Sequence, residues 1–170
     1  MARPLNCTSE ELLGHLQASV EDVFQTMLNT LVTVVEPASG EPRAALPATL
    51  EPERVHVEAK VEISGPQNGA LLLQCSAEGA MDIARGLLML EAGTTVSLDE
   101  VKDAIGECAN LVTGALKTRA FDPHGTFRLG VPQIATRSTR DRQPDVGQLV
   151  FRMSEGCVSV EIWLDEPAAG

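Results

Sequence analysis

The sequence predicts an α+β domain in which helices pack on one face of a largely antiparallel sheet. Two pairs of extended segments, within residues 55–75 and 148–165, are each joined by a short turn. Helical spacing of apolar residues marks three other stretches, at residues 8–30, 76–90 and 97–121. Because hairpins dominate the connections between strands, we expect mainly antiparallel pairing, with the helices gathered on one side.

The first predicted helix begins at Thr8. Thr8 can cap this helix, and Glu11 completes a capping box in which side chains satisfy two free backbone donors. An apolar stripe follows at helical spacing to about residue 30 and comprises Leu12, Leu13, Leu16, Val20, Val23, Phe24, Met27, Leu28 and Leu31. The β-branched run at residues 31–35 then predicts a short strand.

We interpret the whole chain, residues 1–170, as a single domain with one long loop and a short tail. Prolines recur at intervals of five within residues 36–54, and proline resists both helices and central strands. The helix before this stretch is too small to be a domain, so the stretch is predicted to be an exposed loop and not a linker. Residues 166–170 form the tail.

Residues 55–64 are the clearest predicted strand, because apolar and polar residues alternate there with a period of two. One face is expected in the core and the other, which carries His56 and Glu58, in water. Turn-forming residues at 65–69 and an apolar run at 70–75 complete a predicted hairpin.

Two helices are predicted next, at residues 76–90 and 97–121. Gly93 is expected to supply the left-handed residue that ends the first. Ser97 and Glu100 form a second capping box at the start of the other helix. The apolar face of this second helix comprises Val101, Ile105, Cys108, Val112 and Ala115.

The last part of the chain is predicted to be extended. Residues 126–138 contain Pro132, which places part of that segment at a sheet edge. Residues 148–153 and 157–165 form a second hairpin, and the core face of its last strand comprises Val158, Val160, Ile162 and Leu164. Trp163 then lies on the other face, at least partly exposed, where it packs under a loop or marks an interface.

Composition excludes several classes of function. The chain has 24 acidic and 13 basic residues, a net charge of −11, and five aromatic residues among 170. Nucleic acids and anionic membranes need concentrated positive charge, so neither is expected as a partner. No run approaches the roughly 20 apolar residues that span a bilayer, and the first residues lack a signal-peptide pattern.

The four cysteines, Cys7, Cys75, Cys108 and Cys157, are widely spaced and form no Cys-x-x-Cys pair. The three histidines lie far from them in sequence, which argues against a zinc site of the usual spacing. We interpret these residues as small core thiols in a reducing compartment, and therefore expect a cytoplasmic protein without a metal of its own.

A polar stripe on the helix at residues 97–121 is the most function-like feature of the sequence. Glu107 and Asn110 are three residues apart, so their side chains are neighbours on the helix surface. Glycine inside a helix costs about 1 kcal/mol relative to alanine, and asparagine also disfavours this position. A helix with Gly106, Asn110 and Gly114 is either tightly packed there or presents that face to a close partner. From spacing alone, a solvated surface remains the simpler interpretation.

The stretch DAIGECANLVTGALKT resembles the signature helix of the CheC/CheX family of chemotaxis phosphatases. The family motif, an Asp, then Glu-x-x-Asn, then Gly, corresponds to Asp103, Glu107, Asn110 and Gly114. The segments ISGPQNGALLLQCS, AMDIARGLLML and GVPQIA resemble the family's pattern before and after this helix. The resemblance extends over residues 9–164 and implies a CheC-like domain.

The resemblance implies a phosphatase that removes the aspartyl phosphate from a phosphorylated CheY-type response regulator. Asn110 would orient the attacking water, and Glu107 would contact the active-site lysine of the regulator. The surrounding helix face in contact with the regulator would comprise Asp103, Gly106, Gly114 and Lys117. Mg²⁺ would belong to the regulator, and this chain would carry no cofactor.

Some members of the family carry the motif twice. The first helix of this chain has Glu21 but Phe24 where the amide would stand, so the motif occurs once. A single copy resembles CheX, which implies a homodimer, and the late strands with Trp163 are candidates for the dimer contact.

Two other functions remain open at this point. A non-catalytic module of the same fold could dock on a response regulator or a flagellar switch component. A classical hydrolase is disfavoured, because the sequence contains no Gly-x-Ser-x-Gly elbow, no phosphate-binding loop and no paired Cys and His.

Overall fold

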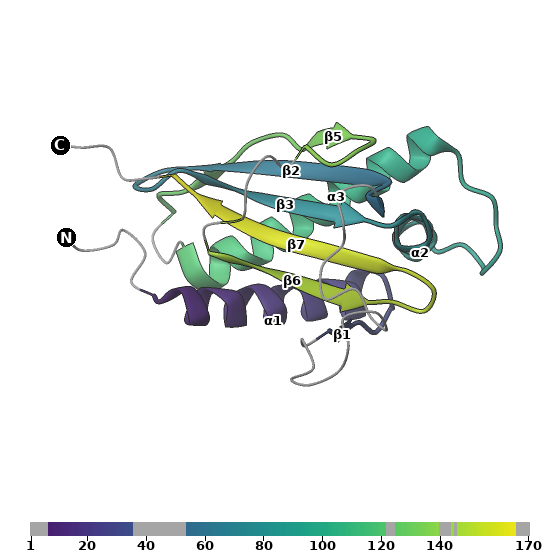
Figure 1. Ribbon diagram of the computed structural model, residues 1–170, viewed down its shortest axis with the longest axis horizontal. Coiled ribbons are helices and arrows are strands. Elements are labelled where there is room, and N and C mark those ends of the chain that lie inside the picture. Colours follow the sequence, from purple (N-terminus) through teal and green to yellow (C-terminus); the bar gives the residue numbers. More distant parts are fainter. Residues whose placement is uncertain (1–6, 36–53, 122–124, 140–143, 145, 166–170) are drawn as a thin grey trace.

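Three helices lie on one face of a seven-stranded antiparallel sheet in the part of the chain that the structure describes (Figure 1). The computed structural model describes residues 7–35, 54–121, 125–139, 144 and 146–165. The predicted α+β class and antiparallel sheet are confirmed. Within these ranges, no helix combines the length and apolar character needed to cross a membrane.

Helix α1 (Ser9–Met27) begins with the predicted capping box. The Thr8 backbone N–H donates to Glu11 Oε2 at 2.6 Å, and the Glu11 N–H donates to Thr8 Oγ1 at 3.1 Å. The predicted apolar stripe is buried as far as Leu28, with the exceptions of half-buried Leu13 and of Met27. Met27 and Leu31 are 50% and 81% exposed, and Leu31 lies beyond the end of the helix, so the predicted stripe extends too far.

The sheet consists of two antiparallel hairpins that pair side by side. Strands β2 and β3 form the first, β6 and β7 form the second, and β3 pairs with β7 to join them. The full order is β1-β6-β7-β3-β2-β4, with β5 also paired to β2. The strands are β1 (Thr33–Val34), β2 (Val57–Ser64), β3 (Gly69–Cys75), β4 (Arg128–Leu129), β5 (Gln133–Ala135), β6 (Gly147–Arg152) and β7 (Cys157–Leu164).

The two edges of this sheet differ. The short strand β1, predicted from its β-branched residues, pairs with β6 at one edge. At the other edge, β4 and β5 pair with the two ends of β2 and are separated by Pro132. Proline cannot donate to a strand ladder, which explains why this edge is split and why Pro132 lies in the gap.

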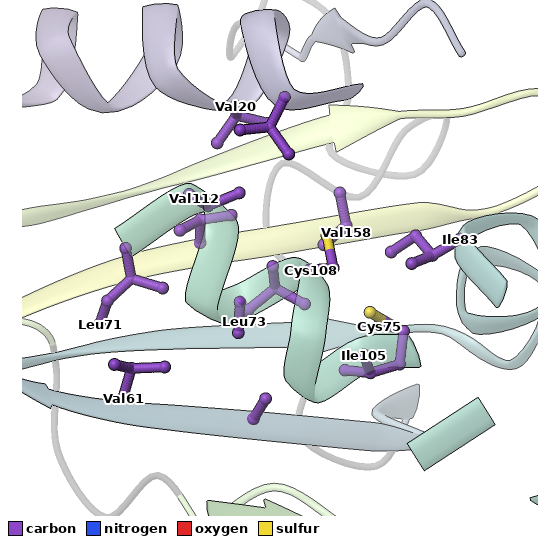
Figure 2. Packing of buried hydrophobic residues seen from close by; sticks show 14 of the residues in the cluster. Val20, Val61, Leu71, Leu73, Cys75, Ile83, Ile105, Cys108, Val112 and Val158 are labelled. Carbon is purple, nitrogen blue, oxygen red and sulfur yellow. The ribbon is translucent and has the colours of Figure 1, made fainter. Parts of the chain in front are cut away.

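The hydrophobic core lies between the helices and the sheet (Figure 2). Alternating residues of the central strands point toward the helices, as the period of two predicts. Figure 2 shows Val61, Leu71, Leu73, Cys75 and Val158 of the strands together with Val20, Ile83, Ile105, Cys108 and Val112 of the three helices. Aliphatic residues and cysteines fill most of this core, in keeping with the low aromatic content.

The face of the sheet opposite the helices is less exposed to solvent than the sequence predicts. His56 is exposed as expected, but Glu58 is only 2% exposed, which corrects the prediction that its whole face lies in water. The Glu58 carboxylate accepts hydrogen bonds from the Thr139 backbone N–H at 2.9 Å, from the Thr139 hydroxyl and from Gln74 Nε2 at 2.6 Å. Residues 138–139, which follow β5, thus cover this part of the sheet.

Helix α2 (Ala77–Leu87) starts at Ser76, as predicted, but ends differently. Hydrogen bonds of the Schellman type close its last turn, and the left-handed residue of that motif is Met89, with φ 57°. Gly93 is also left-handed, with φ 84°, but lies four residues further on. The prediction that Gly93 ends this helix was therefore wrong.

Three predicted features lie mainly outside the described residues. They are the loop at residues 36–54, of which only Arg54 is described, the turn at 122–125 and the tail at 166–170. The residues of the candidate site lie on the helix at residues 97–121 and at residues 132–134, which are all described.

Candidate functional site

Helix α3 (Leu98–Leu116) carries the predicted site and is held in place from its first residue. The Ser97 backbone N–H donates to Glu100 Oε2 at 2.9 Å, and the Glu100 N–H donates to Ser97 Oγ at 3.2 Å. The bond from the Ser97 backbone, together with one from the Ser97 hydroxyl to Glu100 Oε2 at 2.8 Å, lowers the pKa of the Glu100 carboxyl. A π-helical turn, η2 (Lys117–Phe121), continues the helix to the predicted end.

The core face of α3 fixes how the helix is rotated. Val101, Ile105, Cys108 and Val112 are at most 3% exposed, and Figure 2 shows the last three among core residues. The helix packs on α1, on α2 and on strand β2. Because the core holds this face, the opposite face of α3 has one fixed orientation relative to the solvent.

The motif residues share that opposite face. Asp103 and Glu107 are exposed, and Asn110, Gly114 and Lys117 are half-buried. Successive residues of an α-helix are about 100° apart around its axis. Relative to Gly106, Asn110 is therefore displaced by about 40° and Glu107 by about 100°. The fold thus presents the carboxylate and the amide side by side.

The two glycines of this face have different surroundings. A Cβ atom at Gly114 would meet nothing within 4 Å, so this position faces open space. A Cβ at Gly106 would lie 3.2 Å from Ile134 Cδ1 and 3.6 Å from Pro132 Cβ. Gly106 is buried, so the expectation that both glycines face a partner needs correction: Gly106 lets this chain's own segment pack closely.

Sequence reasoning missed that the segment around β5 forms a side of the site. Pro132 and Ile134 pack against α3 at Gly106, and β5 lies beside this helix (Figure 1). Val131, the residue before Pro132, is 85% exposed. An extended edge segment could be predicted from Pro132 and its neighbours, but nothing in the sequence indicated which helix that segment would contact.

The ionisable and polar groups of this face are the carboxylates of Asp103 and Glu107, the Asn110 amide and the Lys117 amine. Burial raises the pKa of the adjacent Cys108 thiol to about 12, so this thiol is neutral and enclosed in the core. Among the described residues, no group of three or more His, Cys, Asp or Glu side chains could hold a metal ion. The Asn110 amide can both donate and accept a hydrogen bond, and the Glu107 carboxylate can accept hydrogen bonds or pair with a cation.

The first helix offers no second site of this kind. Glu21 is exposed on α1, but Phe24, three residues later, is fully buried in the core. The residue that would stand in the place of the amide therefore packs inside the protein and supports the fold.

The family model for the chemotaxis phosphatase CheX matches residues 57–153, which include β2, β3, α2, α3 and part of the second hairpin. This range is more than half of the chain and contains every residue of the candidate site. A comparison with curated protein sequences gave no match.

Solved structures of low sequence identity share the fold. The chemotaxis protein CheX from Vibrio vulnificus aligns with 94% of this chain and 100% of its own, at 19% identity and a TM-score of 0.70. A CheX–CheY–BeF₃–Mg²⁺ complex from Borrelia burgdorferi aligns with 91% of this chain and 98% of the matched chain, at 16% identity and 0.64. FliY from Thermotoga maritima aligns with 90% and 86%, at 14% identity and 0.59. The fold is therefore CheC-like.

Proposed function

The chain belongs to the CheX family of chemotaxis phosphatases, and from this premise we propose that it hydrolyses the aspartyl phosphate of a CheY-type response regulator. The observation that carries the proposal is the placement of Glu107 and Asn110. Both side chains stand on the outward face of a helix whose other face is locked in the core. An outward-facing pair of this kind is suited to entering the active site of another protein.

Asn110 orients the attacking water in this proposal. Hydrolysis of an acyl phosphate requires a water molecule in line with the bond that breaks, and positioning is a large part of catalysis in phosphoryl transfer. A side-chain amide can hold that water through its carbonyl oxygen while its N–H group donates to a second acceptor. Asn110 is half-buried, which restricts the orientations that its side chain can adopt.

Glu107 anchors the helix to the regulator. It is exposed and about 60° further around the helix from Asn110, so it can reach a different group in the same active site. In the proposed complex, its carboxylate pairs with the active-site lysine of the regulator. A charge-assisted pair of this kind becomes stronger once docking excludes water.

The proposal assigns Mg²⁺ to the regulator and no cofactor to this chain. Asp103, Gly114 and Lys117 complete the surface that meets the regulator, and the open space at Gly114 supports this assignment. The protein is proposed to act in the cytoplasm, where its four cysteines, none of which forms a disulfide, would remain reduced. A homodimer would present two such surfaces.

A second candidate function is docking without catalysis, on a response regulator or a flagellar switch component. The observation that favours it is the likeness in fold to FliY from Thermotoga maritima and to the FliM middle domain from Helicobacter pylori. The presence of both Glu107 and Asn110 argues against it, since recognition alone does not need an amide placed to orient water.

Substitution of Asn110 tests the proposal. In the presence of phosphorylated CheY-type regulator and Mg²⁺, we expect Asn110→Ala to lower the rate of phosphate release by about a hundredfold, because the water loses its position. Gln25→Ala, which removes an exposed amide from α1, is the matched control and should leave the rate unchanged. An Asn110→Ala variant as active as the parent would refute the mechanism. A parent that binds the regulator without accelerating phosphate loss would favour the docking function.

A further inference from the structure

Val131 is a rigidly held apolar residue on the surface. Its side chain is 85% exposed, although both neighbouring residues are fixed by contacts. The Gly130 backbone N–H donates to the Glu62 carbonyl oxygen at 2.8 Å. Pro132, whose ring fixes its φ, packs against α3 at Gly106. The backbone therefore presents Val131 in one place, and docking through it costs little conformational entropy.

This residue lies beside the candidate site. Pro132 Cβ is 3.6 Å from the position that a Cβ at Gly106 would occupy, and Val131 is the next residue. Asn110 follows Gly106 by about one helical turn, or about 6 Å along the axis, and is displaced about 40° around it. Glu107 is displaced about 100°. The segment with Val131 thus borders the Asn110 side of the motif.

The net negative charge of this protein does not favour the approach of a phosphorylated partner. Asp103 and Glu107 are exposed carboxylates on the motif face, and the whole chain carries a net charge of −11. A phosphoryl group adds negative charge to the opposing surface. Long-range electrostatics therefore do not favour encounter, and the short-range pair proposed for Glu107 leaves a role for close apolar contacts in affinity.

We propose that Val131 is an apolar docking contact for the response regulator, packing on a hydrophobic part of the receiver domain beside its phosphorylation site. The inference rests on the proposed function, because it takes the regulator as the occupant of this surface. Val131 contributes affinity and helps to choose among regulators, whereas Asn110 acts on the water.

Substitution of Val131 by serine tests the inference, and Leu31→Ser provides a matched control. Leu31 is 81% exposed and precedes β1, at the sheet edge opposite to β4 and β5. With a CheY-type receiver domain activated by beryllofluoride and Mg²⁺, we expect Val131→Ser to raise Kd about tenfold and Leu31→Ser to leave it unchanged. In steady-state assays Val131→Ser should raise KM while kcat at saturation stays near that of the parent.

Four outcomes would separate the two proposals. Equal Kd and KM for Val131→Ser and the parent, with Asn110→Ala inactive, would overturn the role of Val131 and leave the phosphatase proposal standing. A fall in kcat without a change in KM would also overturn the docking role. A change in the native mass of Val131→Ser would identify a second copy of this chain as the occupant and reject the regulator. An active Asn110→Ala would instead refute the phosphatase mechanism itself.

Discussion

Glu107 and Asn110 are neighbours on α3, yet the fold surrounds them differently: Glu107 is exposed and Asn110 is half-buried. Their shared face could be predicted, because helical spacing alone decides which residues of a helix are neighbours. The role of Gly106 could not be predicted, because the atoms that contact it belong to Pro132 and Ile134. Glu58 is a similar case, since Thr139 covers it from 81 positions along the chain. Local periodicity carries no information about such contacts.

Cys108 should make stability decrease at alkaline pH. Burial raises its pKa to about 12, and the nearby Glu107 carboxylate adds to the shift. A thiol in an unfolded chain titrates at about 8.5, so above that pH the unfolded state releases a proton that the folded state keeps. The contribution of Cys108 is complete below pH about 8 and declines as pH rises toward 12, by up to about 1.4 kcal/mol per pH unit.

Urea unfolding of the parent and Cys108→Ala at pH 8, 9 and 10 measures this contribution. The variant lacks the thiol, so its free energy of unfolding should decline less steeply with pH. The pKa of Cys75, which Cys108 also raises, stays raised in the variant because burial is the main cause. Equal slopes would show that the pKa of Cys108 does not differ between the folded and unfolded states as expected.

Glu58 and Glu62 lie on the same face of β2 and should respond very differently to substitution. Glu58→Ala leaves the buried Gln74 amide, and the N–H and hydroxyl of Thr139, without this acceptor, so we expect a loss of about 2–4 kcal/mol in the free energy of unfolding. Glu62 is exposed, and its side chain lies 3.7 Å from that of Lys60 at the surface. Glu62→Ala should change stability by less than about 1 kcal/mol. Chemical denaturation compares them, and similar losses would contradict a structural role for the Glu58 network.

At the scale of elements, most starts and pairings were predictable and several ends were not. Both capping boxes, at Thr8 and Ser97, are present because their partners lie three residues away. Both hairpins were predictable from the turn residues between alternating strands. The end of α2 was predicted wrongly because Met89 adopts a left-handed backbone conformation that usually favours glycine. The prediction therefore chose Gly93, four residues later, as the end of the helix.

The two glycines of α3 offer a paired test of packing. Gly114→Ala adds a methyl group in open space, so it should stabilise the helix by about 0.5–1 kcal/mol. Gly106→Ala places its methyl 3.2 Å from Ile134 Cδ1, and the crowding should cancel most or all of that gain. Thermal unfolding of both variants measures the difference, and equal stabilisation would show that the segment with Ile134 yields freely.

A larger residue at Gly114 tests clearance for the partner. Gly114→Leu fits the open space of the isolated chain, so it should fold, but its side chain would occupy the room proposed for the regulator. Regulator binding should then weaken while the thermal midpoint stays near that of the parent. Unchanged binding would show that the regulator does not need the open space at Gly114.

For the whole molecule, the sheet has β4 and β5 at one edge and β1 at the opposite edge. The edge with β5 is the one that contacts α3. The antiparallel class could be predicted from the two hairpins. The pairing of the two hairpins through β3 and β7 could not be predicted, because these strands are far apart in sequence. Ser76, directly after β3, and Cys157, the first residue of β7, are 81 positions apart. Apolar patterns show which face of each strand is buried but not which strands are neighbours.

The homodimer remains a prediction at this scale. Light scattering at micromolar concentration should give about twice the 18.1 kDa of one chain. Trp163 is half-buried and lines a hollow of about 490 Å³ on the helix-free face with Leu72 and Ala70. Trp163→Ala should raise the monomer fraction, whereas Leu31→Ser at the β1 edge should not. A parent that is monomeric at every concentration would rule out the dimer.

The capped and packed helix α3 has a consequence for how a signal would end. Its motif residues already project from a fixed scaffold, so they require no rearrangement of this chain before they meet a partner. Under the proposed function, the lifetime of the phosphorylated regulator in a cell then depends on the abundance of this protein and on how tightly it docks. Adaptation time would accordingly be set by gene dosage and by competition among regulators for one rigid surface.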